Sequence, residues 1–282
     1  MIIFFEGGRL GNQIFQYCGL KKICGKDRIY IYGMHSLKKS FINLDLIKSN
    51  FLIDYMIRRI GQKRFLYLSK KIGFIGYIEE KDEAGEVMFY RHPGLIKSIY
   101  FCSTIYFQSE KLLDEKTASE IELEPSIISK ASRIINQRSE PLSRPYFIHI
   151  RRGDYASFPY PHASAMLPME WYIEQIELIY AYCKNPCFIV VTDDVKYAKD
   201  YFQHRSDIYI SSEKEEVDLG IMSLCDGGIL SASSFSWFGA YFAHHKNPSG
   251  LFIAPKYWWG LRFGEWMPPS IKTNWITYVR AP

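Results

Sequence analysis

The second half of the chain alternates between strand-like and helix-like segments from residue 146 to residue 254. Short apolar runs rich in β-branched residues predict strands, and longer segments with apolar side chains at helical spacing lie between them. The expected strands cover residues 146–151, 187–192, 207–211, 228–231 and 250–254, and the expected helices cover residues 169–182, 195–203, 215–225 and 234–245. Such alternation is typical of a parallel sheet with helices on both faces. The sequence therefore predicts an α/β fold for this half.

The first half is less regular, although it begins with the same kind of unit. Residues 2–5 predict a short buried strand that leads through a glycine-rich loop into an apolar helix ending near Cys24. Further along we expect a strand at 27–32, helical spacing at 37–72, loops and short strands at 73–108, a helix at 109–138 and a linker with two prolines at 139–145. We therefore expect an N-terminal α/β domain at 1–140 and a C-terminal domain at 141–282.

The strand expected at residues 146–151 ends in an unusual set of polar side chains. His149, Arg151, Arg152 and Asp154 fall within six residues. Ligands of open α/β sheets bind outside the carboxyl ends of the strands, where paired guanidinium groups can fork onto phosphate or carboxylate oxygens. The pattern therefore indicates a phosphate clamp. A plainer interpretation is that one arginine pairs with Asp154 and the other lies in solvent.

A second strand end carries three serines. Ser233, Ser234 and Ser236, with Phe235 among them, lie where an expected strand gives way to an apolar helix. Hydroxyl groups and the free backbone N–H groups of a helix N-terminus suit a phosphate. Capping the helix needs only one such serine, so the stretch favours a phosphate site over capping alone.

Thr192, Asp193 and Asp194 end another expected strand. Thr192 and Asp194 are interpreted as caps of the following helix, whereas Asp193 is positioned to line a cleft. The two aspartates do not indicate a metal site, because adjacent residues at a strand end point to opposite faces. The sequence contains no Asp-x-Asp pattern, and no bound metal is expected.

The loop after the first strand contains Gly7, Gly8 and Gly11, followed by Asn12. Glycines allow positive φ and close backbone approach, and the helix N-terminus beyond them can receive an anion. Gly8 and Arg9 are the candidates for contacting a donor there. The spacing matches neither a Walker loop nor the dinucleotide-binding G-x-G-x-x-G pattern, and a tight turn between strand and helix is the alternative.

The composition and the apolar runs of the chain predict its cellular location. Six cysteines without a C-x-x-C pair indicate reduced thiols in a cytoplasmic protein. The N-terminus has no basic stretch and only four apolar residues after Met1, so no signal peptide is predicted. No apolar run approaches the ~20 residues of a membrane span. We expect a cytoplasmic protein, or one that lies peripherally on the inner face of the cytoplasmic membrane.

Positive charge gathers between residues 38 and 71, where nine basic residues outnumber two acidic ones and aromatic residues such as Phe41, Tyr55 and Tyr67 are interspersed. Basic and aromatic side chains together suit contact with an anionic membrane surface, and a solvated basic face is the alternative. Nucleic-acid binding is disfavoured, because these basic residues are mixed with aliphatic runs and the second half of the chain is slightly acidic.

Three stretches, Gly7–Gln13, His149–Tyr155 and Ser233–Ala240, occur in an order and at distances that resemble the family 11 glycosyltransferases, the α-1,2-fucosyltransferases, many of them bacterial. The resemblance implies a GT-B fold with two Rossmann-like domains facing across a cleft, an acceptor-side N-terminal domain and a C-terminal domain that binds the GDP-sugar. It implies inverting, metal-independent transfer of L-fucose from GDP-fucose to the 2-hydroxyl of a galactosyl unit, without a cofactor. The expected acceptor is a surface-polysaccharide or O-antigen glycan, which such systems commonly carry on lipid.

The resemblance also implies roles on the donor side. Arg151 resembles the arginine that holds the β-phosphate of the donor, and His149 resembles the neighbour that helps to fix the nucleotide. The Ser233–Ser236 turn resembles the second half of the diphosphate site. Arg152 and Asp193 are the remaining donor-binding candidates of the C-terminal domain.

Asn12 resembles the asparagine that faces the sugar–phosphate junction. Cleavage of a glycosyl–phosphate bond places negative charge on the leaving diphosphate, so positive charge and N–H donors aimed at it lower the barrier without a metal. The acceptor hydroxyl also needs a proton acceptor, for which Asp154 and Glu6 are both candidates.

Some residues depart from the family pattern. Relatives often have asparagine before the paired serines and Trp-Trp after them, whereas this chain has Ala232 and Trp237-Phe238, and Cys225–Gly228 is less basic than expected. The guanine contacts of relatives are therefore not carried over to these residues. The alternatives are a transferase of the same fold with another linkage or another nucleotide sugar and, outside enzymes, a non-catalytic sugar-binding protein.

Overall fold

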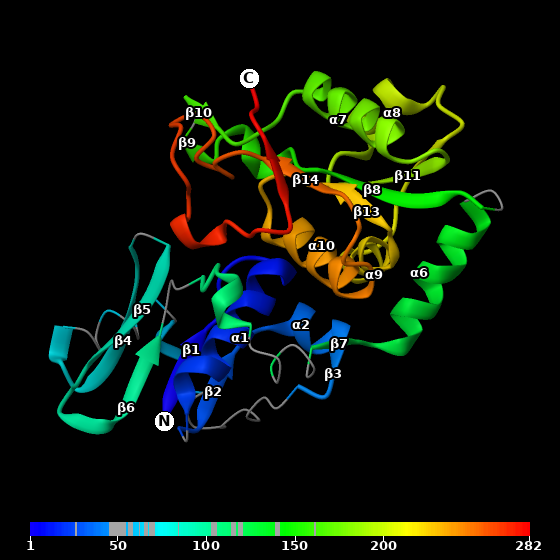
Figure 1. The fold of residues 1–282 in the computed structure, drawn as a ribbon. Coiled ribbons are helices and arrows are strands. Elements are labelled where there is room, and N and C mark those ends of the chain that lie inside the picture. The colour runs from blue at the N-terminus through cyan, green and yellow to red at the C-terminus, as the bar shows by residue number, and fades with distance from the viewer. Residues whose placement is uncertain are drawn as a thin grey trace. The chain divides into compact units, whose positions relative to one another are not determined.

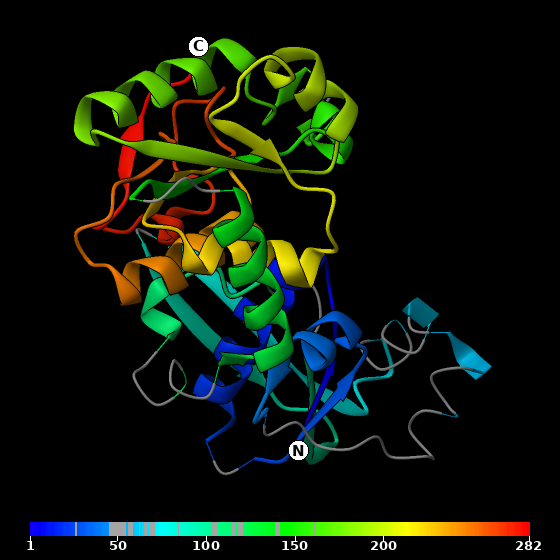
Figure 2. The same cartoon turned by 90° about the vertical axis from the view of Figure 1, so that its right-hand side faces the viewer.

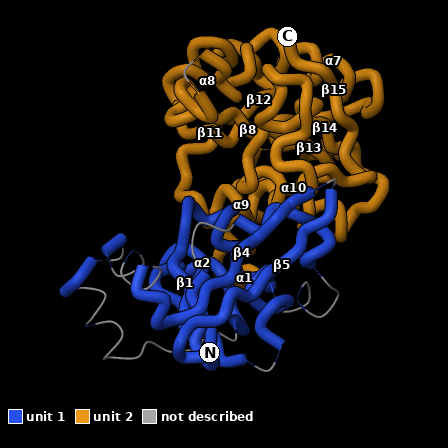
Figure 3. The backbone as a smooth tube through the Cα atoms, turned by 90° about the vertical axis from the view of Figure 1, so that its left-hand side faces the viewer, with its two compact units in different colours: residues 1–122 blue, residues 123–282 orange. Residues whose placement is uncertain are grey.

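The computed structural model describes residues 1–25, 27–44, 55, 59–61, 63, 64, 67, 71–83, 85–102, 106–113, 117, 121–138, 142–160 and 162–282. The chain divides into two compact units, Met1–Glu122 and Leu123–Pro282, shown in different colours in Figure 3. The boundary therefore lies earlier than the expected residue 140. The expected linker falls partly outside the described residues, as do most of residues 45–70.

The first unit contains a mixed sheet with helices. Its elements are β1 (Ile2–Phe5), α1 (Leu10–Cys24), β2 (Ile29–Tyr32), α2 (His35–Ser40), β3 (Phe41–Ile42), β4 (Ile75–Glu83), β5 (Glu86–His92), β6 (Ile96–Cys102) and the 3₁₀ turn η1 (Glu110–Leu112), and β7 (Glu122–Leu123) lies at the boundary. The five-stranded sheet has the order β2-β1-β6-β4-β5. All neighbouring strands are parallel except β4 and β5, which form an antiparallel hairpin.

Two expectations for this region were wrong. Within residues 73–108, expected to hold loops and short strands, the described residues include the three longer strands β4, β5 and β6. The single helix expected at 109–138 is interrupted by η1 and β7, and its last part is α6, which begins at residue 125. The short strand β1, the helix α1 and the strand β2 are confirmed, and β1 is fully buried.

The second unit is a parallel sheet covered by helices on both faces (Figure 1). Its elements are α6 (Pro125–Arg138), β8 (Arg144–Ile150), η2 (Gly153–Ala156), β9 (Pro159–Tyr160), β10 (Ala163–Ser164), α7 (Met169–Tyr182), β11 (Pro186–Thr192), α8 (Val195–Phe202), β12 (Ile208–Ile210), α9 (Glu215–Leu224), β13 (Gly227–Ile229), α10 (Ser234–Lys246), β14 (Phe252–Pro255), η3 (Pro269–Ile271) and β15 (Thr277–Val279). The expected strands and helices at 146–254 are confirmed, with boundaries within two residues. The α/β fold class is therefore confirmed.

The sheet of the second unit has the order β12-β11-β8-β13-β14-β15, with every neighbouring pair parallel. Helices α7 and α8 cover one face, and α9 and α10 cover the other (Figure 2). The central strand β8 shows why this arrangement is stable. Tyr146, Ile148 and Ile150 pack into the core beneath α7, because alternate side chains of a strand point to the same face. Phe147 points to the opposite face, against Phe252.

Helix α6 belongs to the second unit because its apolar stripe packs on α9. A Cβ atom placed on Gly220 of α9 would lie 3.0 Å from Ile127 and 3.1 Å from Ala131, so the two helices approach closely there. Ile127, Ala131 and Ile135, spaced by four residues, are all buried. This contact moves the unit boundary to the N-terminal side of α6.

Candidate active site

The order of the strands singles out one edge of the second unit. From β8 the chain moves outward to β11 and β12, and then returns to β13 on the other side of β8. The loops that follow β8 and β13 therefore lead away from each other at the carboxyl ends of two neighbouring strands. This is the switch point at which open α/β sheets bind ligands. The two polar strand ends predicted from the sequence meet there.

His149 lies at the centre of this switch point. Its side chain is buried, its Nδ1 atom lies 2.6 Å from Ser231 Oγ, and its ring centroid lies 5.6 Å from that of Phe235. Burial, with a smaller contribution from the positive charge of Arg151, lowers the pKa of His149 to about 3. The imidazole is therefore neutral at physiological pH, and it can accept or donate a hydrogen bond without adding charge.

Arg151 is held between two carboxylates. Its guanidinium donates to Asp154, and its NH1 atom lies 2.9 Å from Asp193 Oδ2. The Arg151 side chain is only 11% exposed, whereas that of Asp154 is 62% exposed. One side of the cation is thus fixed by the more enclosed Asp193, and the other is covered by a carboxylate that water or a ligand can reach.

Arg152 is not left in solvent, contrary to the plainer interpretation. Its guanidinium carbon lies 3.4 Å from the centroid of the Tyr197 ring, and its Nε atom lies 3.4 Å from Asp194 Oδ2. Cation–π packing of this kind fixes a guanidinium while leaving its edge available for hydrogen bonding. The pairing of one arginine with Asp154 is observed, so that part of the plainer interpretation is confirmed.

Asp193 braces the turn that carries both arginines. Besides pairing with Arg151, its Oδ1 atom accepts a hydrogen bond of 2.9 Å from the backbone N–H of Arg152. A Cβ atom at Gly153 would lie 2.7 Å from Asp193 Oδ2, so only glycine permits this approach. Asp193 therefore belongs to the site because it contacts the turn that carries Arg151 and Arg152.

Asp194 caps α8 as predicted, whereas Thr192 bonds to Asp194 and not to the helix. Asp194 is the N-cap of α8 and accepts a hydrogen bond of 3.0 Å from Tyr197 N, while Thr192 Oγ1 accepts one of 3.0 Å from Asp194 N. The two adjacent aspartates therefore serve different partners. Across the described residues, no group of three or more His, Cys, Asp or Glu side chains is arranged to hold a metal ion.

The serine turn after β13 divides into a capping part and a more accessible part. Ser233 is the N-cap of α10 and accepts from Phe235 N at 3.3 Å. Ser236 is fully buried and donates to the carbonyl oxygens of Ser231 and Ser233, both at 3.1 Å. The prediction that Ser236 offers its hydroxyl to a ligand is therefore wrong for this structure: it shapes the turn. Ser234 and Phe235 are half-buried at the start of the helix.

The glycine-rich loop of the first unit is fixed by side chains of α1. Gln16 accepts from Gly7 N at 3.2 Å and donates to Gly7 O at 2.9 Å. Gly8 has φ +78°, and a Cβ atom there would collide with the Asn12 side chain. Gly8 and Arg9 are exposed at the N-terminal end of α1, as the prediction of an accessible loop requires.

Asn12 is half-buried in the first turn of α1, and its Oδ1 atom accepts a hydrogen bond of 2.9 Å from Gln108 Nε2. Gln108 follows Phe107, which is fully buried against Gly19. The Asn12 amide is thus oriented by a residue almost a hundred positions away. No local sequence pattern could have found this partner.

Glu6 has structural partners. Its carboxylate accepts from Gln13 Nε2 at 3.0 Å and from the backbone N–H of Met34, which precedes α2. Gln13 in turn accepts from Leu37 N at 2.9 Å. Glu6 therefore ties α1 to the start of α2, and Asp154 is the more accessible of the two proton-acceptor candidates.

Two further groups near the carboxyl edge, the half-buried Tyr155 and the buried Asp218, were not among the predicted site residues. Tyr155 donates a hydrogen bond of 2.6 Å to Ala232 O, which links the loops after β8 and β13. Asp218 of α9 accepts from Ser211 Oγ at 2.6 Å, and burial raises its pKa to about 7. An acid between the apolar Val217 and Leu219 was the available signal for Asp218.

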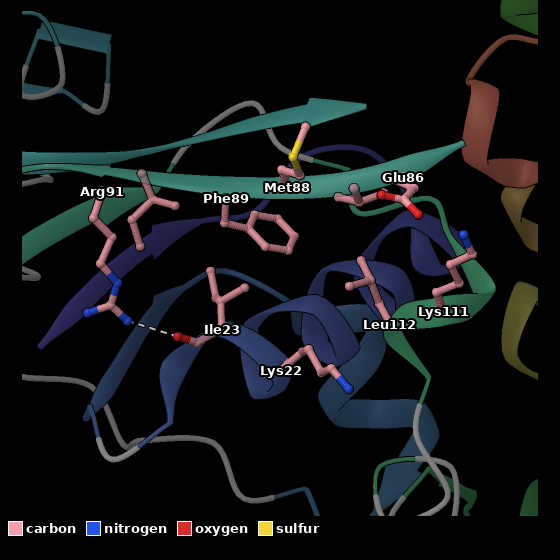
Figure 4. A pocket seen from close by; sticks show the side chains of 10 residues that line it. Lys22, Ile23, Glu86, Met88, Phe89, Arg91, Lys111 and Leu112 are labelled. Carbon is pink, nitrogen blue, oxygen red and sulfur yellow. Dashed lines mark hydrogen bonds between the residues drawn. The ribbon is translucent and has the colours of Figure 1, made fainter. Parts of the chain in front are cut away.

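A pocket of about 500 Å³ lies apart from these residues, in the first unit between α1, η1 and the β4–β5 hairpin (Figure 4). Ile78, Phe89 and Leu112 are among its apolar lining residues. The Arg91 guanidinium at its end donates to Ile23 O at 2.9 Å (Figure 4). The same guanidinium pairs with Asp27 at 2.7 Å. None of the predicted site residues lines this pocket.

Residues 77–279 match the sequence model of glycosyl transferase family 11, and the chain therefore belongs to this family. Among proteins of assigned function, it is 25% identical to the O-antigen biosynthesis glycosyltransferase WbnK of Escherichia coli, over 89% of this chain and 92% of that protein. It is 28% identical to an alpha-1,2-colitosyltransferase of Escherichia coli, over 89% of this chain and 90% of the relative. It is 24% identical to galactoside alpha-(1,2)-fucosyltransferase 1 of Bos taurus, over 84% of this chain and 64% of that protein.

The fold is also similar to solved structures. The crystal structure of POFUT1 in complex with GDP aligns with a TM-score of 0.53, at 12% identity, over 90% of this chain and 97% of that one. A second POFUT1 crystal structure, with GDP-fucose, aligns with a TM-score of 0.51, at 10% identity, over 88% of this chain and 95% of the other. The chain is thus a glycosyltransferase of the GT-B type, and the family expected from the three motifs is confirmed.

Proposed function

We propose that the protein transfers L-fucose from GDP-fucose to the 2-hydroxyl of a galactosyl unit in an O-antigen-type glycan, with inversion and without a metal. The observation that carries the proposal is the placement of Arg151, held by Asp154 and Asp193 at the switch point of the second unit. The α-1,2-fucosyltransferase and O-antigen transferase among its relatives support the choice of donor and acceptor.

The chemistry needs positive charge where the diphosphate leaves. Arg151 supplies a fixed cation, and the N-terminus of α10 at Ser233 and Ser234 supplies backbone N–H groups from the neighbouring strand end. His149 is neutral, so it orients the nucleotide by hydrogen bonding and leaves Arg151 as the cation. These groups are arranged before the donor binds, which lowers the barrier without reorganisation during the reaction.

The diphosphate and Asp154 compete for the same guanidinium. When phosphate oxygens take one side of Arg151, Asp193 still holds the other side, and the exposed Asp154 carboxylate is released. A released carboxylate next to the donor is suited to accept the proton of the attacking hydroxyl. In this scheme Asn12, oriented by Gln108, acts at the sugar–phosphate junction.

A second donor is favoured by one comparison. The relative that is 28% identical is named an alpha-1,2-colitosyltransferase, and colitose is a 3-deoxy relative of fucose. A single missing hydroxyl changes discrimination strongly only where a protein group is built to bond it. GDP-colitose is therefore the alternative donor for the same site.

The direct test is incubation of the purified protein with GDP-fucose and a panel of β-galactosyl acceptors, with and without excess EDTA. We expect release of GDP, an α-1,2-linked product and no loss of rate with EDTA, because Arg151 and the α10 N-terminus take the place of a metal. GDP-colitose in a parallel incubation ranks the two donors. Abolition by EDTA with rescue by Mg²⁺ or Mn²⁺, or a product with another linkage, would contradict the proposal.

Peripheral contact with an anionic, cytoplasmic membrane face, where a lipid-linked acceptor would lie, stays a prediction. No described helix has the length and apolar character to cross a membrane. In the basic stretch at 38–71, the described side chains of Arg59, Lys63 and Arg64 are exposed. Phe41, expected to meet the membrane, is instead buried in β3, so that part of the expectation is wrong.

Co-sedimentation with vesicles of rising anionic lipid content tests this contact. Each cation near such a surface contributes about 1 kcal/mol, so the wild type should sediment at low salt and a variant with Arg59, Lys63 and Arg64 changed to Gln should sediment less. Equal recovery of both proteins in the supernatant would show that the basic segment is a solvated face and does not bind the membrane.

A further inference from the structure

A patch of exposed aromatic side chains lies beside the arginine turn in the second unit. This aromatic patch consists of the exposed Phe158, Tyr160, His162 and Phe263 together with the half-buried Trp259. Phe158 is 38% exposed, Tyr160 53% and Phe263 39%. Large rings left in water by a folded unit are a recognised mark of a binding surface.

The rings of the aromatic patch contact one another. Tyr160 stacks on His162 with ring centroids 5.7 Å apart and meets the edge of Phe263 at 6.0 Å. Phe158 meets Trp259 edge-on at 5.5 Å. Phe158, Tyr160 and His162 therefore form one surface with Trp259 and Phe263, which are distant in sequence.

The backbone beneath the aromatic patch is tied down. Strands β9 and β10 pair as an antiparallel hairpin, and Ala165 N donates to Phe158 O at 2.7 Å. Ser164 Oγ donates to Tyr155 O, and Arg262 Nε donates to Ser164 O at 3.4 Å. Rings on a fixed backbone lose little conformational entropy when a ligand binds.

The Tyr155 ring joins the aromatic patch to the candidate active site. The Tyr155 ring stacks on Phe158 with centroids 5.4 Å apart, and the Arg151 guanidinium carbon lies 5.5 Å from the centroid of the same Tyr155 ring. Asp154, the exposed carboxylate that pairs with Arg151, precedes Tyr155 in the chain. A ligand on the aromatic patch would thus lie next to the reacting groups.

We propose that the aromatic patch binds a neutral pyranose ring of the acceptor glycan, and this inference rests on the proposed function. The C–H face of a pyranose packs on aromatic rings, and its hydroxyls bond to polar groups at their rim, as amphipathic tyrosine and tryptophan surfaces permit. Exposed charges of both signs adjoin these rings in the chain, because Arg262 and Glu265 lie beside Phe263 and Asp154 precedes Tyr155. A mixed rim suits an uncharged, hydroxyl-rich ligand better than an anionic membrane, which selects for cations.

Direct binding is measured first, because it requires no turnover. Saturation-transfer NMR is recorded with lactose, N-acetyllactosamine and galactosyl-β-1,3-N-acetylgalactosamine on wild type, Tyr160→Ala and Phe263→Ala. Tyr182→Ala is the matched control, because Tyr182 is 55% exposed on α7 and makes no ring contact with the aromatic patch among the described residues. We expect at least one disaccharide to bind wild type and the control alike, and to bind both patch variants several-fold more weakly.

Steady-state kinetics with the best acceptor then separates binding from chemistry. Removing one stacking ring should raise the acceptor KM by roughly 5- to 20-fold, with a much smaller change in kcat and no change in the KM for GDP-fucose. Sugar binding that depends on Tyr160 and Phe263 in a protein that does not use GDP-fucose would uphold the aromatic patch and overturn the proposed function. The proposal that the aromatic patch binds the acceptor would be overturned by equal disaccharide binding and equal acceptor KM in wild type and both folded patch variants. It would also be overturned if the wild type bound neutral vesicles and no sugar.

Discussion

Replacing Arg151 with lysine is expected to lower kcat by on the order of 10²–10³-fold in a protein that keeps its fold, the loss seen when one preorganised donor to a developing negative charge is removed. The guanidinium bridges two carboxylates at once, with Asp193 on one side and Asp154 on the other. An ammonium group is a point charge on a flexible stem and cannot hold a phosphate while also keeping the Asp193 contact.

Arg280→Lys makes a matched control for this experiment, since Arg280 is exposed and lies outside the site. Both variants are compared with wild type by thermal melting and by initial rates at saturating donor and acceptor. Arg151→Lys turnover close to that of Arg280→Lys would remove the arginine clamp from the mechanism.

Asn12→Ala is expected to lower kcat by about 10²-fold while leaving the affinity for GDP unchanged. The amide is held by Gln108 at 2.9 Å, so its dipole is oriented before a donor arrives, and such a group contributes most when charge develops at the sugar–phosphate junction. The binding of GDP should instead depend on the second unit. Calorimetric titration of GDP should therefore show weaker binding to Ser234→Ala and unchanged binding to Asn12→Ala.

Asn136→Ala, an exposed position on α6, controls for the loss of an amide. The reverse pattern, with GDP affinity lost in Asn12→Ala and kept in Ser234→Ala, would assign the nucleotide to the glycine-rich loop of the first unit.

The second unit could be predicted closely because its signals are local. The strands β8, β11, β12, β13 and β14 lie in short apolar runs, and each helix between them shows its own periodicity, so no knowledge of partners was needed. In the first unit, the full strands β4 and β5 were not predicted, and the reason is physical. Their antiparallel hairpin is largely accessible on one side, so β5 alternates exposed and half-buried residues and lacks an apolar run.

The candidate site follows the same division. Its location could be predicted, because the polar residues at 149–154 and 233–236 directly follow apolar strand-like runs in the sequence. The part that each side chain plays could not, since Asp193 reaches across to the arginine turn, Ser236 turns back into its own loop and Asn12 depends on Gln108. Such contacts join strands and loops that the sequence holds far apart.

The packing of α6 on α9 has a practical meaning for anyone who wishes to prepare the nucleotide-binding half separately. A fragment that starts at residue 141, where the prolines suggest a natural cut, would lack α6 and leave Gly220 of α9 without Ile127 and Ala131 above it. That newly wetted strip of α9 is apolar and would favour self-association. A fragment that starts at Leu123 keeps the helix and its cover, so the better place to cut lies eighteen residues before the one that the sequence invites.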